Sequence, residues 1–129
     1  MPANTEPIFT LTPEIGFGQV SVANALRDGT GTIVDIITGT TFGTRIDKIT
    51  VTATGTTTAG MVRLFLYTGT VTRLFMEVSV VAATPSASVQ AFTQTVVFDH
   101  GVILPVGWKL QASTNNAETF NVFAFSGDY

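Results

Sequence analysis

Threonine and the other β-branched residues dominate this chain and constrain its fold more than any other feature. Of the 129 residues, 23 are Thr, 15 are Val and 8 are Ile, so more than a third are branched at Cβ. Such side chains lose rotamer freedom in a helix and pack well on a pleated strand. Twelve glycines and five prolines supply the turns between short extended segments. The composition therefore predicts an all-β protein.

Alternation of apolar and polar residues predicts about eight strands and no helix. The clearest case is the run that contains Ile49, Val51 and Ala53, where each apolar residue is followed by a polar one. The expected strands are 19–25, 32–38, 45–54, 61–67, 71–80, 89–99, 108–114 and 119–125. Short strands separated by turn signals are typical of a β-sandwich or jelly roll, and a closed barrel is the alternative.

Residues 1–18 are predicted to form an extended N-terminal arm ahead of a single β-sandwich domain, 19–129. Prolines at positions 2, 7 and 13 disfavour both a helix and a central strand here. An edge strand packed on its own domain is the other interpretation. An extended segment gains affinity when it adds to the free edge of a sheet, so we expect the arm to dock on a partner. Its candidate docking residues are Ile8, Phe9, Leu11, Ile15 and Phe17.

Several expected strands carry aromatic residues on the face opposite their other apolar residues. Soluble monomers rarely expose apolar patches beyond a few hundred Å². Loops or the arm could cover these rings, or the rings could form an oligomer interface. We predict the interface, and with it a homo-oligomer. The candidate oligomer or docking face consists of Phe65, Tyr67, Phe75, Phe123 and Phe125.

Charge and composition argue against several classes of partner. The six Lys and Arg residues are scattered and the net charge is −3, whereas nucleic-acid binding and anionic membranes both require basic clusters. We therefore expect neither nucleic acid nor a membrane as partner. No apolar run reaches the ~18 residues that span a bilayer, and no signal peptide is visible at the N-terminus. The chain has no cysteine, so disulfides and thiolate chemistry are excluded.

Residues with catalytic potential are few. The single histidine, His100, follows Asp99 in an expected turn, and no Gly-x-Ser-x-Gly motif is present. The turn 28–31 lacks the further ligands of a calcium loop. Trp108 opens an alternating strand and is expected in the core rather than in a sugar-binding platform. The sequence predicts no catalytic residues, no metal, no cofactor and no enzymatic activity.

Four segments resemble a group of small all-β proteins of tailed bacteriophages and prophages. They are residues 2–10, residues 28–32, the stretch Leu104-Pro105-Val106-Gly107-Trp108-Lys109-Leu110 and the end Gly127-Asp128-Tyr129. The similarity runs along almost the whole chain and extends to head decoration (cement) proteins. It implies a homotrimer on the capsid surface of the virion that clamps the major capsid protein, made in the host cytoplasm. A tail or fibre component with receptor or glycan binding, and a non-viral carbohydrate-binding module, are the alternatives.

Overall fold

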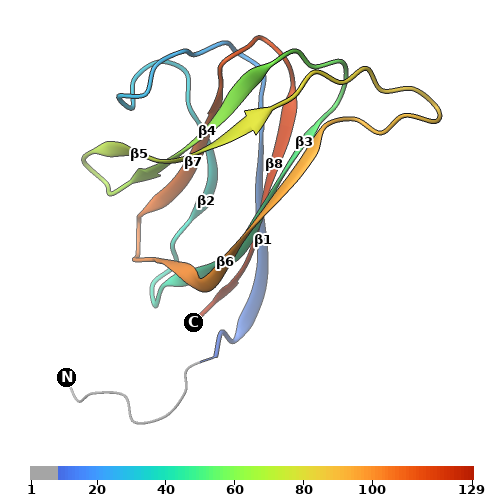
Figure 1. Ribbon diagram of the computed structural model, residues 1–129. Coiled ribbons are helices and arrows are strands. Elements are labelled where there is room, and N and C mark those ends of the chain that lie inside the picture. Colours follow the sequence, from blue (N-terminus) through green and yellow to red (C-terminus); the bar gives the residue numbers. More distant parts are fainter. Residues whose placement is uncertain (1–8) are drawn as a thin grey trace.

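The computed structural model describes residues 9–129, which form eight strands and no helix (Figure 1). The strands are β1 (Thr12–Val20), β2 (Val34–Thr38), β3 (Thr44–Ala53), β4 (Gly60–Tyr67), β5 (Thr72–Val80), β6 (Thr93–Leu104), β7 (Lys109–Thr114) and β8 (Phe120–Asp128). They make two antiparallel four-stranded sheets, in the orders β1-β8-β3-β6 and β2-β7-β4-β5. The predicted all-β sandwich is confirmed. In the described range no helix could cross a membrane.

The core lies between the two sheets and follows the alternation of the sequence. One side chain in two along β3 and β8 points inward, and β4 and β7 supply the facing layer. Burial of each such Val, Leu or Ile side chain contributes about 1.5–3 kcal/mol relative to exposure. The fully buried inward residues include Ile49, Val51, Val122, Ala124, Val62, Leu64, Leu110 and Ala112.

The first strand corrects the predicted arm. Residues 12–18 belong to β1, an edge strand paired along its whole length with β8, and not to an arm. Residues 1–8 of that arm lie outside the described part of the chain. The alternative interpretation, an edge strand, is therefore correct from Thr12 onward, and β1 begins seven residues before the expected strand at Gln19.

Backbone hydrogen bonds explain how a proline fits within β1. The N–H of Leu11 donates to Asp128 O (2.8 Å), whereas the N–H of Tyr129 donates to Gly43 O on the opposite side of β8 (3.1 Å). Even-numbered residues of β8 therefore direct their backbone groups toward β1. In the observed register the even-numbered residues of β1 form hydrogen bonds with these groups. Pro13 consequently turns its missing N–H to the free edge, where no ladder bond is lost.

The sixth strand is longer than predicted because a bulge lies where a turn was expected. Asp99, His100 and Gly101 were assigned to a turn that ended a strand, but β6 continues through them to Leu104. The pairing of β3 with β6 changes register between Ile46 and Lys48, which leaves extra residues on β6. Gly101 has a φ of 72°, which glycine adopts without steric cost.

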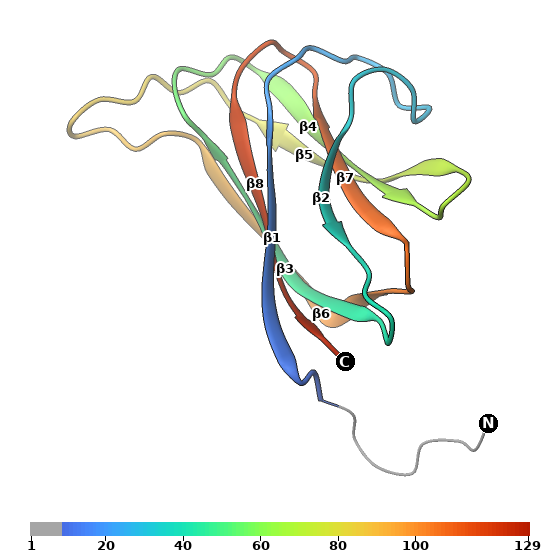
Figure 2. The same ribbon diagram turned by 180° about the vertical axis from the view of Figure 1, so that it is seen from behind.

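Two glycines let β1 approach β2 of the other sheet. A Cβ at Gly16 would lie 2.5 Å from Ile37 Cβ and 2.7 Å from Ile36 O, and one at Gly18 would lie 2.9 Å from Asp35 O. Any side chain at these positions would push the two strands apart. The glycines therefore bring the neighbouring edges of the two sheets into contact, as Figure 2 shows for β1 and β2.

The connection between β1 and β2 crosses the outer face of the second sheet. The N–H of Asn24 donates to Thr114 O (2.8 Å) on β7, and Gly29 packs against Thr72 at the start of β5. Beneath it, the buried Arg63 guanidinium donates to Glu77 Oε2 (3.0 Å) and to Asn24 O (3.1 Å). This connection shields the outer side of β4 from water.

We predict that Gly16→Ala destabilises the sandwich. The added methyl group meets backbone and Cβ atoms that cannot move aside, and overpacking of this kind costs about 1–3 kcal/mol. The measurement is the free energy of unfolding in denaturant. Gly55→Ala is the matched control, because a Cβ there meets nothing within 4 Å. Equal stability of the two variants would contradict the proposed close packing of β1 on β2.

Candidate docking surface

The outer face of the first sheet carries an apolar strip made by β1 and β8. Ile15 pairs with Phe125 and Phe17 with Phe123, and all four side chains point away from the core. The Phe17 and Phe123 rings are 5.9 Å apart. Ile15 is 57% exposed and Phe17 is 68% exposed. We define Ile15, Phe17, Phe123 and Phe125 as the apolar strip, since large apolar side chains rarely gather in water without a partner.

One lysine borders the apolar strip. Lys48 on β3 pairs with both Phe125 and Val97, so it lies between β8 and β6 on the outer face. Its Nζ is 5.0 Å from the centre of the Phe125 ring, within the range of a cation–π contact. Nearby on β3, Arg45 Nε donates to Asp47 Oδ1 (3.0 Å). Charge thus lies beside the strip and not within it.

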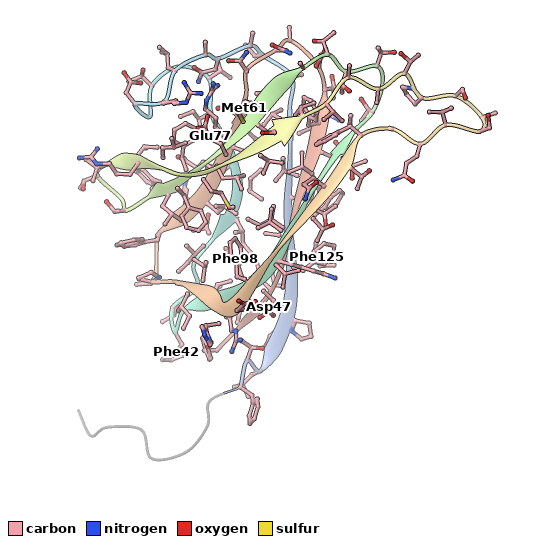
Figure 3. All side chains as sticks on the ribbon, in the orientation of Figure 1. Phe42, Asp47, Met61, Glu77, Phe98 and Phe125 are labelled. Carbon is pink, nitrogen blue, oxygen red and sulfur yellow. The ribbon has the colours of Figure 1, made fainter. Side chains whose placement is uncertain are left out.

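A second group of exposed apolar side chains lies at the end of the sandwich where β8 finishes. The N–H of Gly107 donates to Gly39 O (3.1 Å), which places the β2–β3 and β6–β7 connections side by side. Figure 3 shows Phe42 at this end of the sandwich. Three of these side chains are about four-fifths exposed: Leu11 at 83%, Phe42 at 80% and Phe9 at 78%. We define Phe9, Leu11, Phe42, Ile103 and Val106 as the apolar end.

Between the apolar strip and the apolar end lies a pair of carboxyl groups, Glu14 and Asp128. Glu14 lines a shallow groove of about 510 Å³ with Pro13, Ile15, Phe125 and Ser126. Its Oε2 atom is buried, and within residues 9–129 no hydrogen-bond donor contacts it. A hydrogen bond to Asp128, then burial and repulsion from that carboxylate, raise the pKa of Glu14 to about 7.

Asp128 keeps the negative charge of this pair. Burial acts against its ionisation, but hydrogen bonds from Glu14, Thr44 and Thr40 together hold the pKa of Asp128 below its ordinary value. The Thr44 hydroxyl donates to Asp128 Oδ1 at 2.7 Å. When Glu14 is protonated, its hydrogen bond to Asp128 joins β1 to the last residues of β8.

Of the predicted interface aromatics, one is fully buried and another is partly buried against the core. Phe65 is fully buried, because the β1–β2 connection covers the outer face of β4. Phe75 packs against the core and lies 5.8 Å from Phe98, because a bulge between Leu64 and Phe65 shifts the register of β5. The expectation that these two rings are exposed was wrong. The alternation assigned both rings to the outer face. The bulge turned Phe75 toward the core, and the β1–β2 connection covered Phe65.

The remaining predicted residues divide between two surfaces. Tyr67 lies on the outer face of the second sheet, where Lys109 Nζ is 5.8 Å from its ring centre. Phe123 and Phe125 lie on the first sheet with Ile15 and Phe17. The structure thus joins two of the five residues of the predicted aromatic face to two of the five residues of the predicted arm. Phe9 and Leu11 belong to the apolar end, and Ile8 lies outside the described residues.

Some residues of the candidate surface were missed by the sequence analysis. Phe42 lies between the expected strands 32–38 and 45–54, and a phenylalanine next to Gly43 in such a turn is itself a signal. Ile103 and Val106 lie between the expected strands 89–99 and 108–114. Glu14 and Asp128 are 114 positions apart, and only the β1–β8 register brings them together.

The residues examined for chemistry remain apart. Asp99 and His100 are exposed on the bulge of β6. Asp28 accepts hydrogen bonds from the backbone and hydroxyl of Thr30, which closes its turn locally. Across residues 9–129 no group of three or more metal-ligating side chains was found. Trp108 packs against the core, as predicted.

No protein-family model matches this sequence, and no curated protein matches it. Two crystal structures of a pentameric capsid protein isolated from metagenomic phage sequences are similar to it, one of them solved by iodide SAD phasing. Each is 20% identical over 94% of this chain, with TM-scores of 0.43 and 0.44. The chain spans about two thirds of their length, 65% in one and 64% in the other.

We predict that folding stability falls as the pH rises from about 4.5 to about 7. The pKa of Glu14 is higher in the folded chain than its ordinary value of 4.5, so the folded chain keeps a proton that the unfolded chain releases. The stabilisation is complete below about pH 4.5 and is lost as the pH passes the folded value. Because Glu14 is only half buried, water screens the effect to the order of 1 kcal/mol.

Denaturant unfolding across this pH range measures the slope. Glu14→Gln should flatten it, because the neutral amide still donates a hydrogen bond to Asp128 at every pH. Asp47→Asn on β3 is the control and should retain the slope. An unchanged slope in Glu14→Gln would show that another group holds the proton.

Proposed function

We propose that this chain is a structural protein of a phage virion that decorates the head, without catalytic activity. In this proposal it forms a homotrimer and binds the lattice of the major capsid protein through the apolar end. The observation that carries the proposal is the apolar surface that runs from Phe17 along β1 to Phe9 and includes Phe42. A rigid sandwich with such a surface can bind and stabilise neighbours.

The strand order supports this proposal. β1 pairs with β8, β2 with β7, β3 with β6 and β4 with β5. The pairing is therefore nested: the first strand pairs with the last, and the two middle strands pair with each other. From this order we infer a jelly roll, an architecture found in viral capsid domains and in lectins. A β-sandwich is also what the resemblance of four segments to small all-β phage proteins implies.

The size of the exposed apolar surface also supports docking. An aromatic side chain carries about 150–250 Å² of surface. On that scale the apolar end and the exposed part of β1 present on the order of 700 Å² of apolar surface. This is about what each partner contributes to a standard interface.

The alternative of a glycan-binding module has less support from the described residues. Carbohydrate platforms expose aromatic rings, whereas Trp108 packs on the core. Tyr67 is half exposed, but its hydroxyl donates to Gly69 O (2.9 Å) and its ring contacts Lys109. We therefore favour a protein partner.

We predict that the protein is a trimer in solution. Burial of Ile15 and Phe17 of β1 between copies removes large apolar surface from water and supplies the driving force. Light scattering coupled to gel filtration at micromolar concentration measures the mass directly. A monodisperse monomer would contradict self-association in solution, and an oligomer of another size would contradict the trimer.

We predict that Phe42→Ser weakens binding to heads about 10- to 100-fold while the sandwich stays folded. Loss of one buried Phe side chain removes about 1.5–3 kcal/mol of transfer free energy, and 1.4 kcal/mol corresponds to a factor of ten. Co-sedimentation with heads that lack the protein measures binding. Val71→Ser, an exposed apolar residue in the β4–β5 turn, is the control and should bind normally. Equal binding by both variants would exclude the apolar end as the docking site.

We predict that deletion of residues 1–11 leaves a folded sandwich that binds heads poorly. Deletion of residues 1–18 should instead unfold the chain, because it removes most of β1 and uncovers β8. Circular dichroism and thermal unfolding distinguish the two truncations. Normal binding by the shorter truncation would show that Phe9 and Leu11 do not contact the capsid protein.

A further inference from the structure

The four edge strands of the sandwich differ in charge. In the second sheet, the edge strand β2 carries Asp35 and the edge strand β5 carries Arg73 and Glu77. In the first sheet, residues 15–19 of β1 and residues 93–97 of β6 contain no charged side chain. Proteins commonly place charges on edge strands to prevent pairing with other chains. The two edges of the first sheet lack this protection over segments of equal length.

Both uncharged segments present backbone groups to solvent. On β1 the odd-numbered residues turn their N–H and C=O groups to the free edge, as the position of Pro13 requires. On β6 the carbonyl of Phe92 accepts from Ala53 N (2.8 Å), so the even-numbered residues through Val96 face β3. Thr93, Thr95 and Val97 therefore direct their backbone groups outward.

The side chains of these two edges point to the same face. Thr93, Thr95 and Val97 are exposed on the outer face of the first sheet, as are Ile15 and Phe17. A ladder formed between the two edges would therefore continue the outer face of the sheet. The side chains of both strands would stay on this outer face after the contact forms.

Strand direction also matches. Each strand of the first sheet is antiparallel to its neighbour, so β1 and β6 at its two edges run in opposite directions. A rotation about an axis along the strands preserves their directions. It brings β6 of one copy beside β1 of the next in the antiparallel sense. Such a head-to-tail contact is heterologous, and repeated rotation closes it into a ring.

We propose that copies of this chain associate through these edges, with Ile15–Gln19 of one copy adding as a strand to Thr93–Val97 of the next. The proposal rests on the self-association in the proposed function and specifies its contact. The favoured register sets Ile15 opposite Val97, Phe17 opposite Thr95 and Gln19 opposite Thr93. An apolar pair, an aromatic with a β-branched residue, and a polar pair are all stabilising cross-strand combinations.

The ends of the contact are also defined by the structure. In this register each of the three pairs exchanges both backbone hydrogen bonds. The next pair would place Pro13 opposite Asp99, where proline lacks a donor and the bulge turns β6 away. On the inner side of the junction Gly16 and Gly18 lie opposite Val96 and Gln94, and β1 adds no side chain there.

A double cysteine variant, Ile15→Cys with Val97→Cys, tests the contact. The chain has no native cysteine, and both positions are exposed, so the variant should fold. Cα atoms of a hydrogen-bonded antiparallel pair are about 5.5 Å apart, within the range of a disulfide. Mild oxidation should produce a covalent ladder on a non-reducing gel. The ladder should end at the ring size, which is three for the proposed trimer.

The control is Ile15→Cys with Thr93→Cys, which differs by four positions along β6, or about 13 Å. It should give no ladder. If neither double variant forms a ladder while light scattering shows an oligomer, this contact is overturned and self-association stands. Ladders of equal yield from both variants would also overturn it. Self-linking of Phe17→Cys alone would indicate a two-fold pairing of β1 with itself and would likewise overturn it. A monomer in light scattering would overturn both proposals.

Discussion

The contact between β1 and β2 determines what this protein presents to its surroundings. Gly16 and Gly18 have no side chains, so the edge strand of one sheet lies against the backbone of the other. At these two positions the inner side of β1 therefore packs directly against β2. Its remaining large side chains, among them Ile15 and Phe17, face solvent beside Phe123 and Phe125. Together with the pairing of β1 and β8, this placement produces the apolar strip, the carboxyl pair and the free edge.

Polar groups serve mainly to fix segments onto the sandwich. Arg63 is buried and ties Glu77 to the backbone of Asn24, which secures the covering segment over β4. Thr57 ties the base of the projecting β5–β6 connection, because its hydroxyl donates to Val81 O (2.8 Å). The hydrogen bond from protonated Glu14 to Asp128 does the same for β1 and β8. These charged groups therefore bind other groups of the same chain. The exposed outer side of β1 remains apolar and is suited to contact with another protein.

Sequence reasoning predicted the fold wherever the strand pattern was local. The alternation around Ile49 placed β3 to within a residue at each end, and the all-β class followed from the β-branched content. It failed where contacts with a segment distant in sequence determined whether a residue joins a strand or is buried. Pro13 argued against a strand, yet an edge position accommodates it. A bulge turned Phe75 inward, and the β1–β2 connection buried Phe65.

The candidate surface could be predicted only in part for the same reason. Ile15, Phe17, Phe123 and Phe125 were each named from the sequence, but in two separate groups. Only the β1–β8 register shows that they form one strip. The Glu14–Asp128 pair depends on the same register and on burial. Neither the register nor the burial can be predicted from the spacing of residues along the sequence.

Electron cryomicroscopy of the particle that contains this protein would locate it on the virion. We predict density for the sandwich on the outer surface of the head, with the end that carries Phe9, Leu11 and Phe42 directed at the capsid lattice. Density for the sandwich in the tail, or on the head with this apolar end directed at solvent, would contradict this prediction.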